Sequence, residues 1–246
     1  MTKLSVNVNK VATLRNTRTI GIPGVARAAA ICLEAGAHGI TVHPRPDARH
    51  IRPEDVEEIA ELVKSYPNAE YNIEGNPFYE YMEYARRLRP SQCTLVPDTP
   101  DAFTSNQGWD LAKDAERLRP IIATLHDHGC RVSLFMDAGA ESLEMAAAIG
   151  ADRIELYTEP YAEGFAHGRS GDALIPFIAT ARRAAELGLG VNAGHDLNRD
   201  NLPPFLAAIP EVLEVSIGHA LIADALEFGL AETVRRYLEA VAGPPV

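Results

Sequence analysis

The chain has 246 residues, of which 46% are hydrophobic and 23% are charged, and its formal net charge at pH 7 is −11. This length suits one large α/β domain, and the hydrophobic fraction is ample for a core. The negative charge argues against a general binder of nucleic acid or of anionic membranes. Cations that converge locally can still hold an anionic substrate.

Eight short strands are expected, because apolar or alternating runs recur between glycine, proline and polar residues. The first run, for example, alternates Leu4, Val6 and Val8 with polar residues. The predicted strands are 4–9, 39–43, 70–74, 92–96, 131–136, 153–157, 190–193 and 214–217.

Helices are expected between these strands, where apolar residues recur at helical spacing. They run from 23 to 36, from 53 to about 66, over 79–88, up to 129, over 140–149 and up to 187, and two short helices precede a Gly-Pro-Pro terminus. Two long loops are predicted, at 97–110 and 159–172, and loops of this length in a compact domain are usually functional or disordered.

Eight βα units in about 250 residues predict a (β/α)8 TIM barrel, an α/β fold. No linker rich in proline, glycine or serine divides the chain, so one domain over residues 1–246 is expected. A doubly wound sheet is the alternative, but it usually has fewer strands for this length.

Three cysteines and the N-terminal sequence favour a cytoplasmic protein. Cys32, Cys93 and Cys130 form no CxxC pair and lie in apolar contexts, as reduced core residues do. The first ten residues contain no apolar segment of signal-peptide type, and no apolar run is long enough to cross a membrane.

Polar or ionisable residues close most of the predicted strands, at the end of the barrel where active sites lie. One histidine at a strand end is more often structural, but six strands ending this way indicate a common site. His43, Glu74 and His195 can exchange protons near neutral pH if their surroundings tune them. The residues at these ends are Asn7, Asn9, His43, Glu74, Glu155, His195, Gly218 and His219.

Cationic groups near these strand ends are suited to phosphate. Residues 39–50, GITVHPRPDARH, form a strand followed by a basic loop, although a surface loop that happens to be basic is equally compatible with this segment alone. Arg18, Arg45, His50 and His219 can bind phosphate dianions. Gly218 precedes a predicted helix start near Ala220, so its amide can face an anion. Two separated groups of cations indicate two phosphates or two substrates.

A metal site is the competing interpretation, because His43, Glu74 and His195 could form a set of two histidines and one carboxylate. No HExxH motif and no cysteine ligand supports it. His126-Asp127-His128 is interpreted as a solvated helix end, where histidine favours the helix dipole. The chain has no GxGxxG motif and no Walker loop, so no nucleotide cofactor is indicated.

Several segments, in order along nearly the whole chain, resemble the pyridoxine 5′-phosphate synthase family. They are VNVNKVATLRNTR, GITVHPRPDARHIR, NIEG, CTLVPD, RVSLFMDA, RIELYTEPYA, VNAGHDLN and IGHALIADAL. The resemblance implies a (β/α)8 barrel with extra helices, assembled as a homo-octamer, with no metal and no organic cofactor. It also implies condensation of 3-amino-2-oxopropyl phosphate with 1-deoxy-D-xylulose 5-phosphate, which yields pyridoxine 5′-phosphate, phosphate and water in vitamin B6 biosynthesis.

The resemblance also implies roles for individual residues. His43 and Glu74 correspond to proton acceptors, His195 to the proton donor, and Glu155 to the residue that stabilises the transition state. The expected contacts to the amino-ketone phosphate are Asn7, Arg18, Gly218 and His219. The expected contacts to the pentulose phosphate are Arg45, His50 and Thr104, the last in a loop that closes over the substrates in the family.

Two positions depart from the common family pattern. Asn9-Lys10 stands where many members have Asp-His, and Asp196 stands where many have the final glycine of NAGHG. Asn9 keeps a hydrogen-bonding side chain, and Lys10 could contact a phosphate or a sugar hydroxyl. Asp196 can offer its backbone amide, but its carboxylate should not face a phosphate.

Two other functions stay open at this stage. The first is another phospho-sugar barrel enzyme of the aldolase or epimerase type, for which Lys10 is the candidate for a Schiff base. The second is a catalytically inactive barrel that acts as a binding protein. Retention of His43, Glu74 and His195 argues against the inactive barrel.

Overall fold

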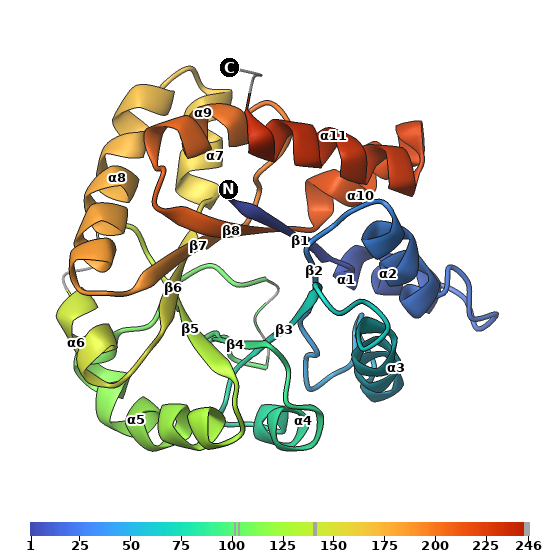
Figure 1. The fold of residues 1–246 in the computed structure, drawn as a ribbon, viewed down its shortest axis with the longest axis horizontal. Coiled ribbons are helices and arrows are strands. Elements are labelled where there is room, and N and C mark those ends of the chain that lie inside the picture. The colour runs from blue at the N-terminus through green and yellow to red at the C-terminus, as the bar shows by residue number, and fades with distance from the viewer. Residues whose placement is uncertain (101, 103, 140–141, 244–246) are drawn as a thin grey trace.

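The computed structural model describes residues 1–100, 102, 104–139 and 142–243. Eight parallel strands pair in sequence order and close into a barrel, in which β8 also pairs with β1. Figure 1 shows these strands in the centre with the helices around them. The strands are β1 (Lys3–Asn7), β2 (Gly39–Val42), β3 (Glu70–Gly75), β4 (Gln92–Leu95), β5 (Arg131–Met136), β6 (Arg153–Tyr157), β7 (Gly190–Gly194) and β8 (Val212–Ile217). The predicted (β/α)8 barrel is confirmed, and a single domain with limits at residues 1 and 246 stays a prediction.

The helices include short additional ones that follow strand ends. Helices α1, α7 and α10 come directly after β1, β6 and β8; α7 packs on α8, and α10 packs on α11. The helices are α1 (Asn9–Asn16), α2 (Val25–Glu34), α3 (Pro53–Val63), α4 (Tyr81–Leu88), α5 (Leu111–Asp127), α6 (Leu143–Ala148), α7 (Glu159–Ala166), α8 (Ser170–Glu186), α9 (Leu202–Ala208), α10 (His219–Phe228) and α11 (Leu230–Ala242).

All eight predicted strands are present, and β5 and β6 have the predicted bounds. The first strand ends two residues early, at Asn7, because the Asn7 side chain accepts a hydrogen bond from the backbone N–H of Asn9 (3.0 Å) and the chain turns into α1. Helices α1 and α9 were not predicted. The predicted helix start at Ala140 and the final Pro244-Pro245 lie outside the described residues.

The prediction of a loop over residues 159–172 is wrong, because α7 occupies its first half and α8 begins at Ser170. Pro160 lies in the first turn of α7, where a missing backbone N–H breaks no helical hydrogen bond. Gly164 lies where α7 meets α8: a Cβ there would come within 2.6 Å of the Ala173 Cβ. Proline and glycine therefore serve helix entry and helix packing here.

The barrel is apolar outside and polar inside. Outward strand residues such as Leu4, Ile40 and Ile73 are buried under the helices. Inside, hydrogen bonds join buried polar side chains of adjacent strands, for example Ser5 to Thr41 (2.7 Å). The same row continues through Asn72 and Thr94. Because these groups satisfy one another, the interior can carry polar side chains up to the barrel mouth.

Two further observations concern the cysteines and the helices. Cys32, Cys93 and Cys130 are buried and free, as predicted. Within the described ranges, no helix has the length and apolar character needed to cross a lipid bilayer.

Candidate active site

A cavity of about 580 Å³ lies at the carboxyl ends of the strands, a size typical of small-molecule sites. Residues from the ends of β1, β2, β3, β6, β7 and β8 line it. The structure therefore brings together the predicted site residues Asn7, Asn9, Lys10, His43, Arg45, His50, Glu74, Thr104, Glu155, His195, Asp196, Gly218 and His219.

Arg18 is the predicted site residue that does not line this cavity. It is exposed in the turn after α1, where its backbone N–H donates to the Arg15 carbonyl (3.3 Å). Lys10, in the first turn of α1, is the cation of this segment that lines the cavity.

His43 lies between two carboxyl groups. Its Nδ1 is 3.7 Å from Glu74 Oε2, and its Nε2 is 3.8 Å from Asp98 Oδ2. All three side chains are buried, and Asn9 Oδ1 accepts a hydrogen bond from the backbone N–H of His43 (3.0 Å). Asn9, one of the two departures from the family pattern, thus holds the end of β2 in place.

The protonation of these groups follows from their burial. Burial, reinforced by the negative charge of Asp98, raises the pKa of Glu74 to about 8. Burial, reinforced by the positive charge of Arg45, lowers the pKa of His43 well below its usual value. At neutral pH the pair is therefore mostly a carboxylic acid beside a neutral imidazole. The pKa of Glu155 is also raised well above its usual value, by burial and then by Glu74.

Thr104 and Tyr157 contact the His195 ring at the end of β7. Its Nε2 is 3.2 Å from the Thr104 hydroxyl, and its ring packs edge-on against Tyr157 with centroids 5.2 Å apart. A Cβ at the preceding Gly194 would come within 2.7 Å of Glu155 Oε1, so the glycine lets that carboxyl approach the strand. Burial lowers the pKa of His195, and the neighbouring carboxylate of Asp196, 4.0 Å from Nδ1, opposes that shift.

The end of β8 presents a helix N-terminus to the cavity. Gly218 is the N-cap of α10, and Gly218, His219 and Ala220 all line the cavity. Asn7 and Lys10 line the cavity as well. Backbone N–H groups at a helix start favour an anion, so this side of the cavity suits a phosphate.

The second group of cations contacts the loop after β4. Arg45 donates to Asp98 Oδ2 (2.7 Å) and to the Ala102 carbonyl (3.0 Å), and Arg49 donates to the carbonyls of Ala102 (2.9 Å) and Pro100 (3.0 Å). Burial and then the charge of Arg45 lower the pKa of His50 to about 4, so its imidazole is neutral at neutral pH. The cations of residues 39–50 thus also bind segment 97–110.

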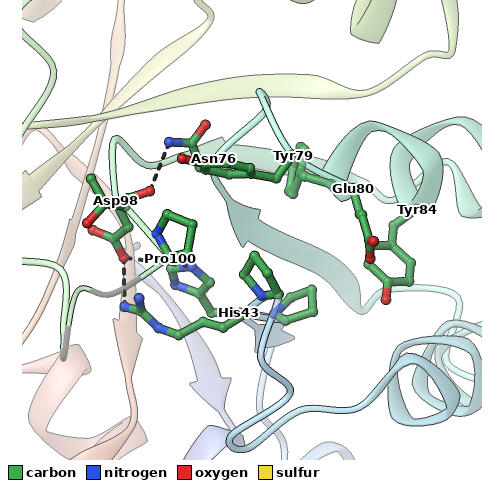
Figure 2. A pocket seen from close by; sticks show the side chains of 12 residues that line it. His43, Asn76, Tyr79, Glu80, Tyr84, Asp98 and Pro100 are labelled. Carbon is green, nitrogen blue, oxygen red and sulfur yellow. Dashed lines mark hydrogen bonds and ion pairs between the residues drawn. The ribbon is translucent and has the colours of Figure 1, made fainter.

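A second, smaller pocket lies on the other side of His43, Arg45 and Asp98. Figure 2 shows it between Pro100 and His43 on one side and Tyr79, Glu80 and Tyr84 on the other. The two pockets share His43 and Arg45 as a common wall.

Sequence reasoning missed Asp98 and Ser105, which contact the predicted residues. Asp98 follows β4 by three residues, so the strand-end rule that selected Glu74 could have found it. Ser105, which donates to Asp98 Oδ2 (2.7 Å), lies in a loop with no periodic pattern and gave no such signal.

The metal interpretation built on His43, Glu74 and His195 gains no support from the distances. In the described part of the chain, the ligand atoms that lie within 4.8 Å of one another belong to a different group, Glu159, His195 and Asp196. Glu159 and Asp196 are exposed, and exposed acidic groups of this kind are common without an ion.

Comparison with known proteins identifies the family. The family described as "Pyridoxal phosphate biosynthesis protein PdxJ" matches residues 4–243. The chain belongs to this family. Relatives named pyridoxine 5′-phosphate synthase include one from Albidiferax ferrireducens, 57% identical over 98% of both chains. Another, from Xanthomonas campestris, is 55% identical over 98% of this chain and 97% of its own length.

Solved structures of much lower identity share the fold alone. Tryptophan synthase from M. tuberculosis superposes with a TM-score of 0.68 at 14% identity, covering 98% of this chain and 92% of that one. Phosphoribosyl anthranilate isomerase from Thermotoga maritima gives 0.61 at 15% identity, covering 99% and 100%. Because one barrel fold carries many chemistries, the PdxJ membership and the cavity residues carry the functional argument.

Proposed function

We propose that the chain is a pyridoxine 5′-phosphate synthase, which condenses 3-amino-2-oxopropyl phosphate with 1-deoxy-D-xylulose 5-phosphate. The carrying observation is that the residues matched to this family's proton transfers, His43, Glu74, Glu155 and His195, line one cavity. The membership in the PdxJ family and relatives of the same name at 55% and 57% identity support the proposal.

The cavity suits a reaction between two phosphorylated substrates. The N-terminus of α10, with Asn7 and Lys10, binds the phosphate of the amino ketone. Arg45, with Thr104, binds the phosphate of the pentulose on the other side. Between these sites, imine formation, phosphate loss and ring closure can use the buried acid–base groups, and exclusion of water protects the imine.

The proposed proton transfers need ionised Glu74 and protonated His195, each the less populated form at neutral pH, because burial raises the pKa of Glu74 to about 8 and lowers the pKa of His195. Glu74 and His43 take protons from the condensing substrates, and His195 donates one to a leaving oxygen. Glu74 must lose its own proton before it can accept one. Because its pKa is raised to about 8, the small ionised fraction of Glu74 limits the rate at neutral pH. The carboxyl of Glu155, which burial keeps uncharged and which lies against Gly194, stabilises the transition state as a hydrogen-bond partner.

The two rival functions are less compatible with the cavity. A Schiff-base aldolase needs a lysine whose pKa is lowered by burial, whereas Lys10 is exposed at the start of α1. Borohydride trapping of the substrate on Lys10 would favour the aldolase. An inactive barrel would bind both phosphates without turnover.

Release of inorganic phosphate tests the proposed function directly. With both substrates present, we expect phosphate and pyridoxine 5′-phosphate in equal amounts, and with either substrate alone we expect neither. Equal phosphate release from one substrate alone would contradict the condensation. The absence of any product from a folded sample that binds both substrates would favour the inactive barrel. A homo-octamer of the 26.7 kDa chain, also proposed, is measurable by sedimentation.

The pH dependence provides a separate prediction. Because Glu74 acts ionised and its pKa is raised to about 8, kcat/KM should rise with pH through about 8. Substrate phosphates lose their second proton near pH 6, about two units lower, so the two ionisations can be separated. If kcat/KM fell only below about pH 6, where the substrate phosphates gain a proton, that result would contradict the role of Glu74.

A further inference from the structure

Asp98 gathers contacts from three catalytic-site segments on one oxygen atom. The side chain is buried, 8% exposed, just after β4. Its Oδ2 accepts hydrogen bonds from Arg45 Nη2 and from the Ser105 hydroxyl, both at 2.7 Å, and lies 3.8 Å from His43 Nε2. The Asp98 backbone carbonyl accepts a further hydrogen bond from the Asn76 side chain at 2.9 Å, as Figure 2 shows.

We propose that Asp98 is a positioning residue for this reaction: its carboxylate fixes the Arg45 guanidinium and places a negative charge against the His43–Glu74 pair. The inference rests on the proposed function, since it concerns the residues assigned to proton transfer and to phosphate binding. It goes beyond that function because Asp98 reaches the chemistry only through other side chains.

The first consequence concerns Arg45. Two of its N–H groups are occupied, one by Asp98 and one by the Ala102 carbonyl, so its plane is fixed before a substrate arrives. A guanidinium held by a carboxylate on one edge can offer its remaining N–H groups to a phosphate on another. The carboxylate also reduces the net positive charge at this site, which limits how tightly the phosphate binds and eases release of the product phosphate.

The second consequence concerns Glu74, which is surrounded by charged and polar groups from several elements. Beyond burial, Asp98 and Glu214 oppose its ionisation, whereas Arg45 and a hydrogen bond from Ser216 favour it. Glu214 lies near the start of β8 and has Arg153 at 4.0 Å. Asp98, which lines the smaller pocket, is thus the carboxylate that both contacts Arg45 and faces the imidazole next to Glu74.

His43 lies between the charge of Asp98 and the carboxyl of Glu74. The groups that oppose its protonation are Arg45, His50 and Arg49 on the loop after β2, and His195 after β7. Asp98 and Glu74 are the carboxyl groups on either side of its ring, at 3.8 Å and 3.7 Å. A proton that leaves Glu74 can therefore reside transiently on His43, facing the charge of Asp98.

The test compares Asp98→Asn with Asp98→Glu and with Asp137→Asn. Asparagine keeps an oxygen acceptor but removes the charge, so the acid limb of kcat/KM should move lower by about 1 pH unit. Asp98→Glu keeps the charge and should leave the limb near its original position. Asp137→Asn is the matched control, because Asp137 also holds segment 97–110, through the Gly108 N–H (3.0 Å), without contacting His43.

Binding of inorganic phosphate, measured by calorimetry, gives a second readout. Asp98→Asn should bind phosphate more tightly than the unmodified chain does, because Arg45 loses its carboxylate partner. Weaker binding, together with an acid limb that does not move, would show that Asp98 only supports the loop and would overturn the proposal. The proposal would also be overturned if Asp137→Asn lost as much activity as Asp98→Asn and neither variant moved the acid limb of kcat/KM.

A third readout requires no turnover. The Glu74 carboxyl can be titrated by ¹³C NMR of glutamate-labelled protein, with its signal assigned from the Glu74→Gln variant. A lower midpoint in Asp98→Asn supports the proposal even if that variant is inactive, and an unchanged midpoint overturns it. If the unmodified chain makes no pyridoxine 5′-phosphate, the proposed function fails, whereas this titration still decides the influence of Asp98.

Discussion

Replacing Glu74 by glutamine is expected to lower kcat by about 100- to 10,000-fold, the range of a lost general base. Glutamine has nearly the same shape as glutamic acid but cannot take a proton. Because the pKa of Glu74 is about 8, its carboxyl is mostly uncharged at pH 7, and glutamine preserves that neutral state. The fold and the binding of both substrates should therefore remain, and KM should change less than kcat.

The measurement is phosphate release under saturating substrates, with thermal unfolding as a check on the fold. Glu80→Gln is a suitable control, since Glu80 is exposed beside the neighbouring pocket. Full turnover by Glu74→Gln would exclude Glu74 as the proton acceptor. A large rise in KM with unchanged kcat would instead assign Glu74 to substrate binding.

Replacing Asp55 by alanine is expected to lower the free energy of unfolding by about 3–5 kcal/mol, because it leaves a buried guanidinium without its counter-charge. Arg15 in α1 and Asp55 in α3 are 7% and 3% exposed and form a two-pronged ion pair. Asp55 Oδ2 also accepts from the Arg52 backbone N–H (2.8 Å). Arg15 further donates to the His50 carbonyl (3.2 Å), so the pair also supports the loop that carries His50.

Urea unfolding at pH 7 measures this effect, read from the midpoint at constant slope. Glu83→Ala is the matched control: it breaks an ion pair to Arg86 whose two side chains are more than half exposed, which should cost less than about 1 kcal/mol. An equal loss of unfolding free energy in both variants would mean that the buried Arg15–Asp55 pair contributes no more to stability than the exposed Glu83–Arg86 pair. Phosphate release should fall further in Asp55→Ala than in the control.

Much of the barrel could be predicted from the local pattern of apolar and turn residues. Each strand is a short apolar or alternating run between turn residues, and the residues on the outer face are apolar because the helices bury them, as in β5 and β6. The pattern was weaker where helices are short or contain proline and glycine. Helices α1, α7 and α9 have only eight, eight and seven residues, so their stability comes from packing against neighbours that a local pattern does not contain.

The candidate site was likewise predictable only in part. Sequence by itself determined that His43, Glu74, Glu155 and His195 would lie in or directly after strands of one barrel, because strand order and alternation bring such residues to one rim. Only the tertiary structure decided that Arg18 lies outside the cavity and that Asp98 meets Arg45 and His43. It also decided which groups are charged, because a pKa depends on burial and on charges brought together from distant parts of the chain.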